Sequence, residues 1–220
     1  YERYDHYLTE PLDPEQLAHQ VAQYDEEIAY VDDQVRRLHE GWTATGRPLL
    51  LVIVSDHGEE FGERGSWGHA HTLYDEQLHV PWILVGDGIE PRVIEERVGL
   101  EDLAPTLASL AGIDHPSGDG LDRAALVQGE PMGEIPGLGG RLACKSQIKT
   151  TRLRWADARW DLYVELSDGQ RVSSLCARRA DPGCETNVVG LYPDQAERLK
   201  QQLWAFLGEP WVAREAGKVR

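Results

Sequence analysis

The chain has 220 residues, 41% of them hydrophobic and 27% charged, a balance that indicates a folded domain rather than a disordered segment. Its 22 lysines and arginines against 38 aspartates and glutamates give a net charge of −16. Such an acidic chain is a poor partner for nucleic acid or an anionic membrane surface. The sequence also gives no indication of a membrane-spanning helix, because no apolar run reaches the ~18 residues that such a helix needs. The chain begins with tyrosine inside a polar stretch, so we expect it to be a piece of a longer protein.

The first regular element in the sequence is an amphipathic helix. Apolar residues recur every three or four positions from Leu17 to Leu38. The helix should begin at Asp13 or Pro14 and end at Gly41 or Gly46. A coiled coil is the competing interpretation, but the run of heptads is short, which favours a helix packed on a sheet.

Two continuous apolar runs follow, at residues 48–55 and 80–86. Neither alternates with polar residues, which is typical of strands buried on both faces of a parallel sheet. The next helix has Leu103, Leu107 and Leu110 on one face and should end at Gly112. This order of elements predicts a three-layer α/β core, which we place at residues 1–128.

The second part of the chain, residues 129–220, differs from the first in composition and in its pattern of apolar residues. Residues 115–140 are rich in proline and glycine and are typical of a linker. Four β-like segments follow, at 142–149, 152–156, 160–166 and 170–175. Asp168-Gly169 indicates a hairpin between the last two. A final amphipathic helix carries Ala196, Leu199 and Leu203. We therefore predict a small antiparallel sheet with a closing helix.

The three cysteines, Cys144, Cys176 and Cys184, do not form a disulfide framework at this chain length. The short loop between Cys176 and Cys184 permits a disulfide in an oxidising compartment, and reduced thiols are an equally good interpretation. The chain has no Cys-x-x-Cys pair, which argues against a zinc ribbon or a dithiol redox site.

The segment from Asp56 to His71 has the strongest chemical signal. Asp56 and His57 follow a predicted buried strand, and ligands of α/β sheets bind beyond the carboxyl ends of strands. A carboxylate beside an imidazole suits a borderline divalent ion better than magnesium, and Gly58 lets the chain turn. A simple cap-and-turn pair is the alternative.

Other polar residues of this segment have plainer interpretations. His69 and His71 are either site residues or solvated loop histidines. Glu59, Glu60 and Glu63 are interpreted as a solvated charge cluster. His19 and His39, in the first helix, are interpreted as surface residues.

Several stretches resemble the sulfatase family, within the alkaline-phosphatase-like superfamily, in order and spacing. The most specific are Val54-Ser-Asp-His-Gly-Glu-Glu-Phe-Gly-Glu63 and Gly68-His-Ala-His-Thr-Leu-Tyr-Asp-Glu76, which runs on to Val80-Pro81. Residues 24–32 and 100–113 agree as well, and the tail at 175–188 agrees more loosely. The resemblance covers residues 20–207 and implies the C-terminal part of an alkaline-phosphatase-like three-layer sandwich.

The resemblance also implies a site and a reaction. Asp56 and His57 would bind the divalent metal, calcium or manganese. His69 would be the catalytic donor facing the sulfate or leaving-group oxygen, and His71 and Arg64 would bind substrate with it. The substrate would be a small-molecule or glycan sulfate ester, attacked by a formylglycine hydrate while the metal polarises the ester oxygens. A metal would also resolve the conflict between an acidic protein and an anionic substrate.

Two departures qualify the resemblance. The chain contains no Cys-x-Pro-x-Arg or Ser-x-Pro-x-Arg motif, so we expect the formylglycine upstream and the isolated piece to be inactive. Arg64 stands where many relatives have histidine.

Three further expectations concern the class of protein and its location. A phosphodiesterase, a phosphonate hydrolase or a phosphoglycerol or phosphoethanolamine transferase of the same superfamily is the alternative enzyme. A non-catalytic interaction domain that retains the fold is the alternative from another class. The family points to an exported protein, and nothing in the sequence decides the oligomeric state.

Overall fold

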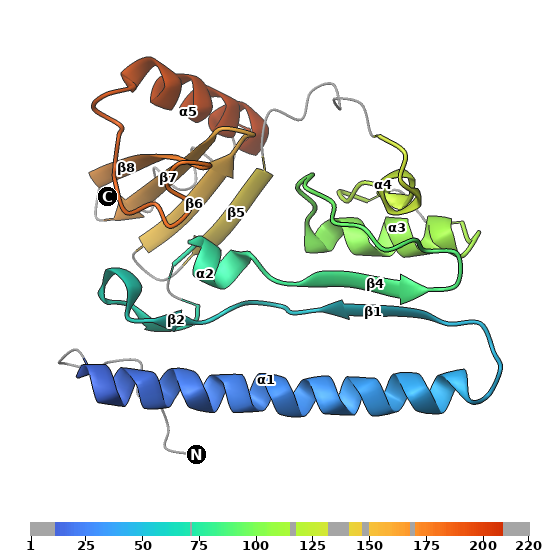
Figure 1. The fold of residues 1–220 in the computed structure, drawn as a ribbon. Helices are drawn as coiled ribbons and strands as arrows, with labels where there is room; N and C mark the ends of the chain where they lie inside the picture. Colours follow the sequence, from blue (N-terminus) through green and yellow to red (C-terminus); the bar gives the residue numbers. More distant parts are fainter. Residues whose placement is uncertain are drawn as a thin grey trace. The chain divides into compact units, whose positions relative to one another are not determined.

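The computed structural model describes residues 12–70, 72–114, 118–131, 141–146, 150–167 and 170–208 (Figure 1). Contacts divide the chain into two compact units that are discontinuous in sequence. The helix unit comprises 18–56 and 80–135, and the sheet unit comprises 57–79 and 136–220 with the residues up to 17. We call residues 57–79 the histidine segment. The division into domains at residue 128 stays a prediction.

The first helix, α1, runs from Pro14 to Thr43, as the apolar spacing predicted. The Asp13 carboxylate caps it by accepting hydrogen bonds from the N–H groups of Glu15 and Gln16, both at 2.9 Å. Proline at the first helical position fits because its missing N–H would have had no partner there. Gly46, with φ at 69°, closes the turn after the helix.

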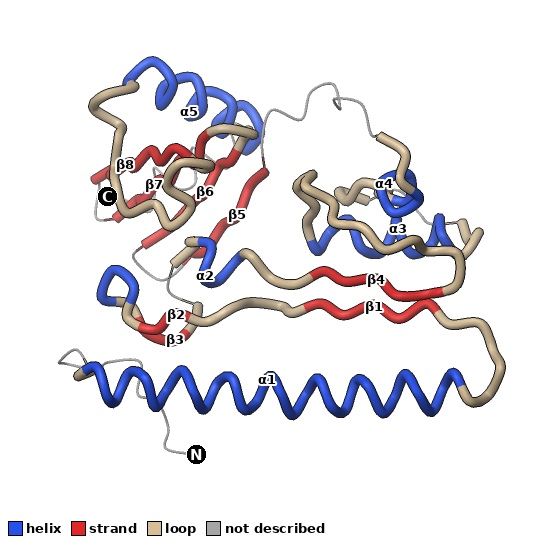
Figure 2. Tube along the Cα trace, in the orientation of Figure 1, coloured by secondary structure: helices blue, strands red, loops and turns tan. Residues whose placement is uncertain are grey.

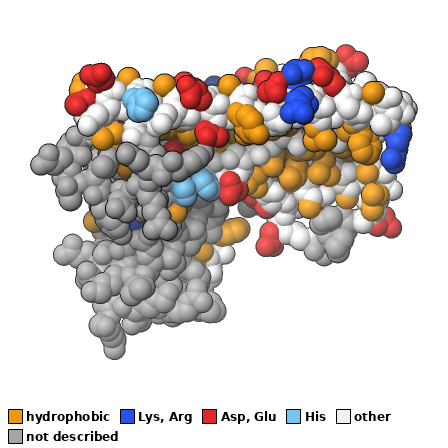
Figure 3. All heavy atoms as spheres, turned by 90° about the horizontal axis from the view of Figure 1, so that it is seen from below, with side chains coloured by type: hydrophobic (Ala, Val, Ile, Leu, Met, Phe, Trp, Pro, Cys, Tyr) orange, Lys and Arg blue, Asp and Glu red, His pale blue; other side chains and the backbone are white. Residues whose placement is uncertain are grey.

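None of the residues of α1 is buried, so the predicted packing of its apolar stripe on a sheet is not met. At 30 residues the helix is ~45 Å long, whereas a strand of 5 residues spans ~17 Å and covers little of such a stripe. Hydrophobic side chains gather over part of the surface in Figure 3. The exposed large hydrophobic residues of the helix unit are Val21, Tyr24, Ile28, Tyr30, Val31, Leu38, Trp42, Leu50, Val54, Ile83, Val85, Val93, Leu100 and Ile113.

Strands β1 (Leu50–Val54) and β4 (Trp82–Gly86) pair antiparallel, from Leu50 opposite Gly86 to Val54 opposite Trp82. The predicted parallel sheet, buried on both faces, is therefore wrong for this pair. Parallel neighbours need a crossover that usually contains a full helix, but α2 (Asp75–Leu78), in the connection here, has 4 residues. Two strands also leave parts of both faces exposed.

The rest of the helix unit is built around a buried carboxylate. The short 3₁₀ turn η2 (Leu100–Asp102) leads into α3 (Leu103–Leu110), and α4 (Ala124–Gln128) follows. Asp102 is fully buried and accepts hydrogen bonds from the N–H of Leu121 at 2.8 Å and from Nε of Arg123 at 2.9 Å. Gly112 follows α3 with φ at 65°, which confirms it as the residue that ends the helix.

The sheet unit contains the predicted antiparallel sheet with its closing helix. Strands β5 (Arg141–Ser146), β6 (Thr150–Ala156), β7 (Trp160–Ser167) and β8 (Gln170–Ala177) pair in sequence order (Figure 2). Helix α5 (Pro193–Leu207) packs on one face. The core between them consists of Leu153, Trp155, Leu162, Val164, Leu175, Ala196, Leu199 and Leu203. Ser167 pairs with Gln170, as the hairpin predicts, although its turn, 168–169, lies outside the described residues.

The two faces of this sheet differ because side chains alternate along a strand. Leu153 and Trp155 of β6 face the core with α5. Arg152 and Arg154 alternate with them, and lie opposite Glu165 and Tyr163 of β7. The second face is thus lined by charged and aromatic side chains. No helix in the described part of the chain is long and apolar enough to cross a membrane.

The structure joins Cys176 and Cys184 in a disulfide, with their Cα atoms 5.2 Å apart. This decides between the two interpretations that the sequence left open. Both cysteines are buried, and the bond closes the turn after β8.

Replacing both Cys176 and Cys184 by alanine should lower the free energy of unfolding by about 2–3 kcal/mol. The bond spans a sequence separation of 8 residues and restricts the unfolded chain accordingly. Urea unfolding of the complete protein under non-reducing conditions measures the change. Wild type measured after reduction of the disulfide is the matched comparison and should lose about as much stability as the double variant. A double variant with the wild-type midpoint would contradict the expectation.

Candidate active site

The histidine segment folds back on itself so that its two ends meet. Strand β2 (Glu60–Phe61) pairs with β3 (Trp67–Gly68), and the 3₁₀ turn η1 (Glu63–Gly65) joins them. The N–H of Gly58 donates to the carbonyl of Gln77 at 2.8 Å. A side chain at Gly58 would collide with the carbonyl oxygen of Glu76, so this close approach requires glycine. The fold of the segment thereby brings residues 57–60 near residues 68–77.

Asp56 and His57 come directly after β1 and are both exposed. Nδ1 of His57 lies 2.9 Å from the carbonyl oxygen of Gly58. Because a carbonyl only accepts, Nδ1 donates this hydrogen bond, and in the neutral imidazole the lone pair is then on Nε2. Metal-binding histidines are held in this way by a backbone carbonyl. The donor set and the tautomer of His57 therefore fit a divalent ion.

The described residues supply only part of such a metal site. No group of three or more histidine, cysteine, aspartate or glutamate side chains gathers as a metal site within the described ranges. Asp56 and His57 provide one carboxylate and one imidazole, whereas structural and catalytic metal sites use three or more protein ligands. Further ligands would have to come from outside the described residues.

His69 lies against His57 and is paired with a carboxylate. The two imidazole rings stack with their centroids 4.1 Å apart and an interplanar angle of 24°. Nδ1 of His69 is 3.2 Å from Oε2 of Glu59. Since an ionised carboxylate only accepts, Nδ1 donates this bond and Nε2 is left as the basic nitrogen. A carboxylate that orients an imidazole is the arrangement used for proton transfer.

Glu59 and Glu60 correct the prediction of a solvated charge cluster. The Glu59 side chain is only 24% exposed and pairs with His69. Glu60 is buried and accepts hydrogen bonds from Oγ1 of Thr72 at 2.8 Å and Nε2 of Gln77 at 2.6 Å. The sequence could not show this, because the partners of Glu59 and Glu60 lie 10 to 17 residues away in an irregular segment.

Both terminal nitrogens of Arg64 and the face of its guanidinium contact protein groups. Its Nη2 is 2.5 Å from Oε2 of Glu76, its Nη1 donates to the Gly183 carbonyl at 2.9 Å, and its guanidinium lies 3.9 Å from the centre of the Tyr74 ring. Burial lowers the pKa of Arg64, but Glu76 and Glu60 outweigh it and raise the pKa overall. These contacts favour a structural role for Arg64, and its predicted binding of substrate stays untested. His71 lies outside the described residues.

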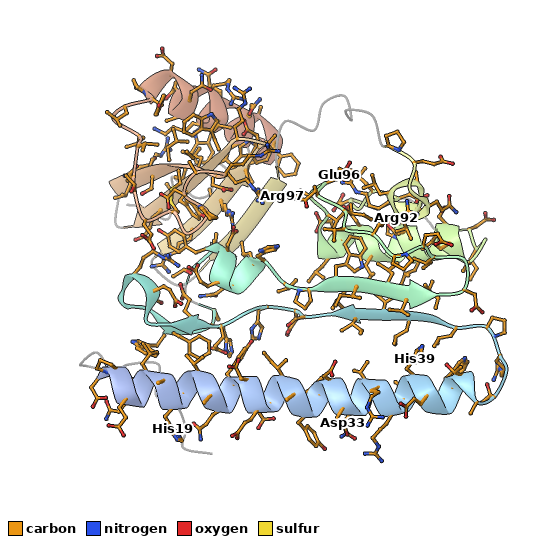
Figure 4. The ribbon with its side chains drawn as sticks, viewed as in Figure 1. His19, Asp33, His39, Arg92, Glu96 and Arg97 are labelled. Atoms are coloured by element: carbon orange, nitrogen blue, oxygen red, sulfur yellow. A yellow bond between two sulfur atoms is a disulfide. The ribbon has the colours of Figure 1, made fainter. Side chains whose placement is uncertain are left out.

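The histidines predicted to lie on the surface are found on α1. Figure 4 labels both, and His19 is exposed while His39 is half-buried. Of the histidines in the described residues, His57 and His69 are the pair joined by a ring contact.

The chain is similar to known proteins in sequence and in fold. The family model named Sulfatase matches residues 1–113, just over half of the chain. Choline-sulfatase of Rhizobium meliloti is 32% identical over 168 residues, which cover 74% of the chain and 31% of that relative. Arylsulfatase K of Mus musculus is 27% identical over 175 residues, with 74% and 31% covered. A solved 2-O GAG sulfatase is 22% identical with a TM-score of 0.60, over 72% of the chain and 36% of that structure.

The chain belongs to the sulfatase family. The solved structure shares its fold, which confirms the predicted alkaline-phosphatase-like α/β class. The chain spans about a third of the length of the curated relatives that it matches.

Proposed function

We propose that the complete polypeptide is a metal-dependent sulfatase that hydrolyses a sulfate ester of a small molecule or glycan. The observation that carries the proposal is the cluster within the histidine segment, where His69 stacks on His57 and is paired with Glu59. Membership of the sulfatase family supports the type of reaction. Choline-sulfatase, one of the relatives, is named for a small sulfate ester.

In this proposal Asp56 and His57 bind calcium or manganese together with ligands from outside the described residues. The bound ion would polarise the oxygens of the sulfate ester. A cation is also needed because the chain has a net charge of −16 and its substrate is an anion. The nucleophile, a formylglycine, would come from residues outside this chain.

His69 acts in the proposal as the proton donor to the leaving oxygen. The Glu59 carboxylate fixes the ring by accepting from Nδ1, so Nε2 is the nitrogen that exchanges the proton. His57 packs against the same ring and limits its rotation.

Replacing His69 by alanine should lower kcat for an aryl sulfate ester by about 10²-fold or more, since a positioned acid–base group contributes that much. The measurement uses the complete, metal-loaded protein. His19→Ala is the matched control, because it removes an exposed histidine of the helix unit and should leave kcat unchanged.

Three outcomes would contradict the proposal. Equal rates for wild type and His69→Ala would exclude the proton-donor role. Hydrolysis of a phosphate diester without hydrolysis of the sulfate ester would favour a phosphodiesterase. A complete protein whose content of bound calcium or manganese is the same in wild type and in a variant lacking the Asp56 and His57 side chains would exclude the metal assignment.

A further inference from the structure

The histidine segment is tied to the charged face of the C-terminal sheet by a buried arginine. Arg154 of β6 has a side chain only 3% exposed. Its Nη2 is 2.6 Å from Oδ1 of Asp75, and its Nη1 donates to the carbonyl of Leu73 at 3.2 Å. Its Nε donates to Asp161 of β7 at 3.0 Å, which keeps the guanidinium on the sheet. One cation of the sheet therefore contacts the segment at two points, Leu73 and Asp75, where α2 begins.

A second arginine makes the reciprocal connection. Arg64, in the histidine segment, reaches the carbonyl of Gly183, beside the disulfide that ends at Cys184. Between the two arginines lie two tyrosine rings, with Tyr74 and Tyr163 4.6 Å apart. Arg64 covers Tyr74 at 3.9 Å, and Arg154 lies 5.3 Å from the centre of Tyr163. The side chains therefore contact one another in the order Arg64, Tyr74, Tyr163 and Arg154, from the histidine segment to strands β7 and β6.

Hydrogen bonds inside the segment connect α2 to the residues around His69. Oε1 of Gln77 accepts from the N–H of Ala70 at 2.9 Å, next to His69. The carbonyl of Gln77 accepts from the N–H of Gly58, next to His57. Nε2 of Gln77 donates to buried Glu60, next to Glu59. A displacement of α2 would therefore move the neighbours of all three site residues.

We propose that the C-terminal sheet, together with the turn after β8, positions His69 through the contacts of Arg154 with Asp75 and of Arg64 with Gly183. The role of His69 itself rests on the proposed function. Arg64 is then a positioning residue rather than a substrate ligand. Stability alone gives little reason for these charges, because a hydrophobic pair of the same volume often stabilises a buried contact as well or better. The hydrogen bonds that Arg154 donates to the Leu73 carbonyl and Arg64 donates to the Gly183 carbonyl add a defined direction, which the ion pair with Asp75 alone would not supply. A site needs such direction from its supporting residues.

Asp75→Asn is the most selective test. This substitution weakens the contact of Arg154 with the histidine segment. It leaves Arg154 paired with Asp161, so the sheet keeps its buried ion pair. In the complete protein, kcat for an aryl sulfate ester should fall about tenfold or more, in the range seen for outer-shell partners, with KM changed less. Amide hydrogen exchange should become faster in residues 57–79 and stay unchanged in α3.

Glu165→Gln is the matched control. Glu165 lies on the same face of β7 as Asp161 and pairs with Arg152 of the sheet, at 2.8 Å, rather than with the segment. This variant should leave both kcat and the exchange of residues 57–79 unchanged. Asp75→Glu, which keeps the charge, should restore part of the lost kcat.

The exchange measurement separates this proposal from the proposed function. If the protein hydrolyses no sulfate ester but Asp75→Asn still speeds exchange in residues 57–79 alone, the positioning contact stands and the proposed function fails. Unchanged exchange in residues 57–79, or faster exchange throughout the protein, would overturn the positioning role. So would an active Asp75→Asn enzyme with the wild-type kcat.

Discussion

Replacing Asp102 by alanine is expected to lower the free energy of unfolding by about 3–5 kcal/mol, the cost of breaking a buried ion pair. Asp102 is fully buried and bridges the N–H of Gly99, the N–H of Leu121 and Nε of Arg123. Without the carboxylate, the guanidinium of Arg123, whose side chain is 8% exposed, keeps its charge in a buried place. Urea unfolding of the complete protein, compared with wild type, measures the loss.

Asp122→Ala provides the matched control for this variant. Asp122 is exposed and accepts a hydrogen bond from the N–H of Ala124, the first residue of α4, at 2.8 Å. Loss of one such hydrogen bond costs about 1 kcal/mol. If Asp102→Ala cost no more than Asp122→Ala, the buried network would not hold residues 118–123 on α3.

The second large effect is expected at Leu199, where alanine should cost about 2–5 kcal/mol. Leu199 of α5 is fully buried against the leucines of the sheet, so the smaller side chain leaves a cavity and loses contacts. The unfolding midpoint of the complete protein, followed by a signal from Trp155 and the other tryptophans, reports the change.

Leu191→Ala makes the same chemical change at a residue that is 76% exposed. Surface substitutions of this kind stay within about 0.5 kcal/mol. Equal effects at Leu199 and Leu191 would show that α5 contributes little to the core.

The sheet unit is the part that local sequence patterns predicted best. Strands β5 to β8 begin and end within a few residues of their expected positions, and α5 buries Ala196, Leu199 and Leu203. Alternation of apolar and polar residues and the Asp168-Gly169 dipeptide are local signals, and neighbouring strands here are consecutive in the chain. The sequence therefore contained what was needed for this sheet.

The direction of β1 relative to β4 needed information that an apolar run does not carry. Both runs are continuous and fit parallel or antiparallel pairing equally well, and the connection decides. The interpretation of Glu59 and Glu60 failed for a similar reason. Acidic residues in a glycine-rich loop are usually solvated. Only the fold shows that Glu59 pairs with His69. It also shows that Glu60 accepts hydrogen bonds from Thr72 and Gln77.

The sequence predicted which residues make up the candidate site, but it did not predict the residues that hold them in place. Asp56, His57 and His69 were found from a motif, and the structure stacks His57 on His69. Arg154 had no such signal, because it stands in a strand where alternation indicates only an outward-facing residue. Its burial comes from the histidine segment, which is distant in the sequence.

That distance has a consequence for the order in which the protein is assembled. Leu73 and Arg154 are 81 residues apart, and Arg64 and Gly183 are 119 residues apart. Contacts that close such large loops are slow to form, and the ribosome releases their second partners well after the first. A nascent or truncated chain that ends before residue 154 would carry every motif residue without the groups that hold them. Possession of the motif is thus not the same as possession of an organised site.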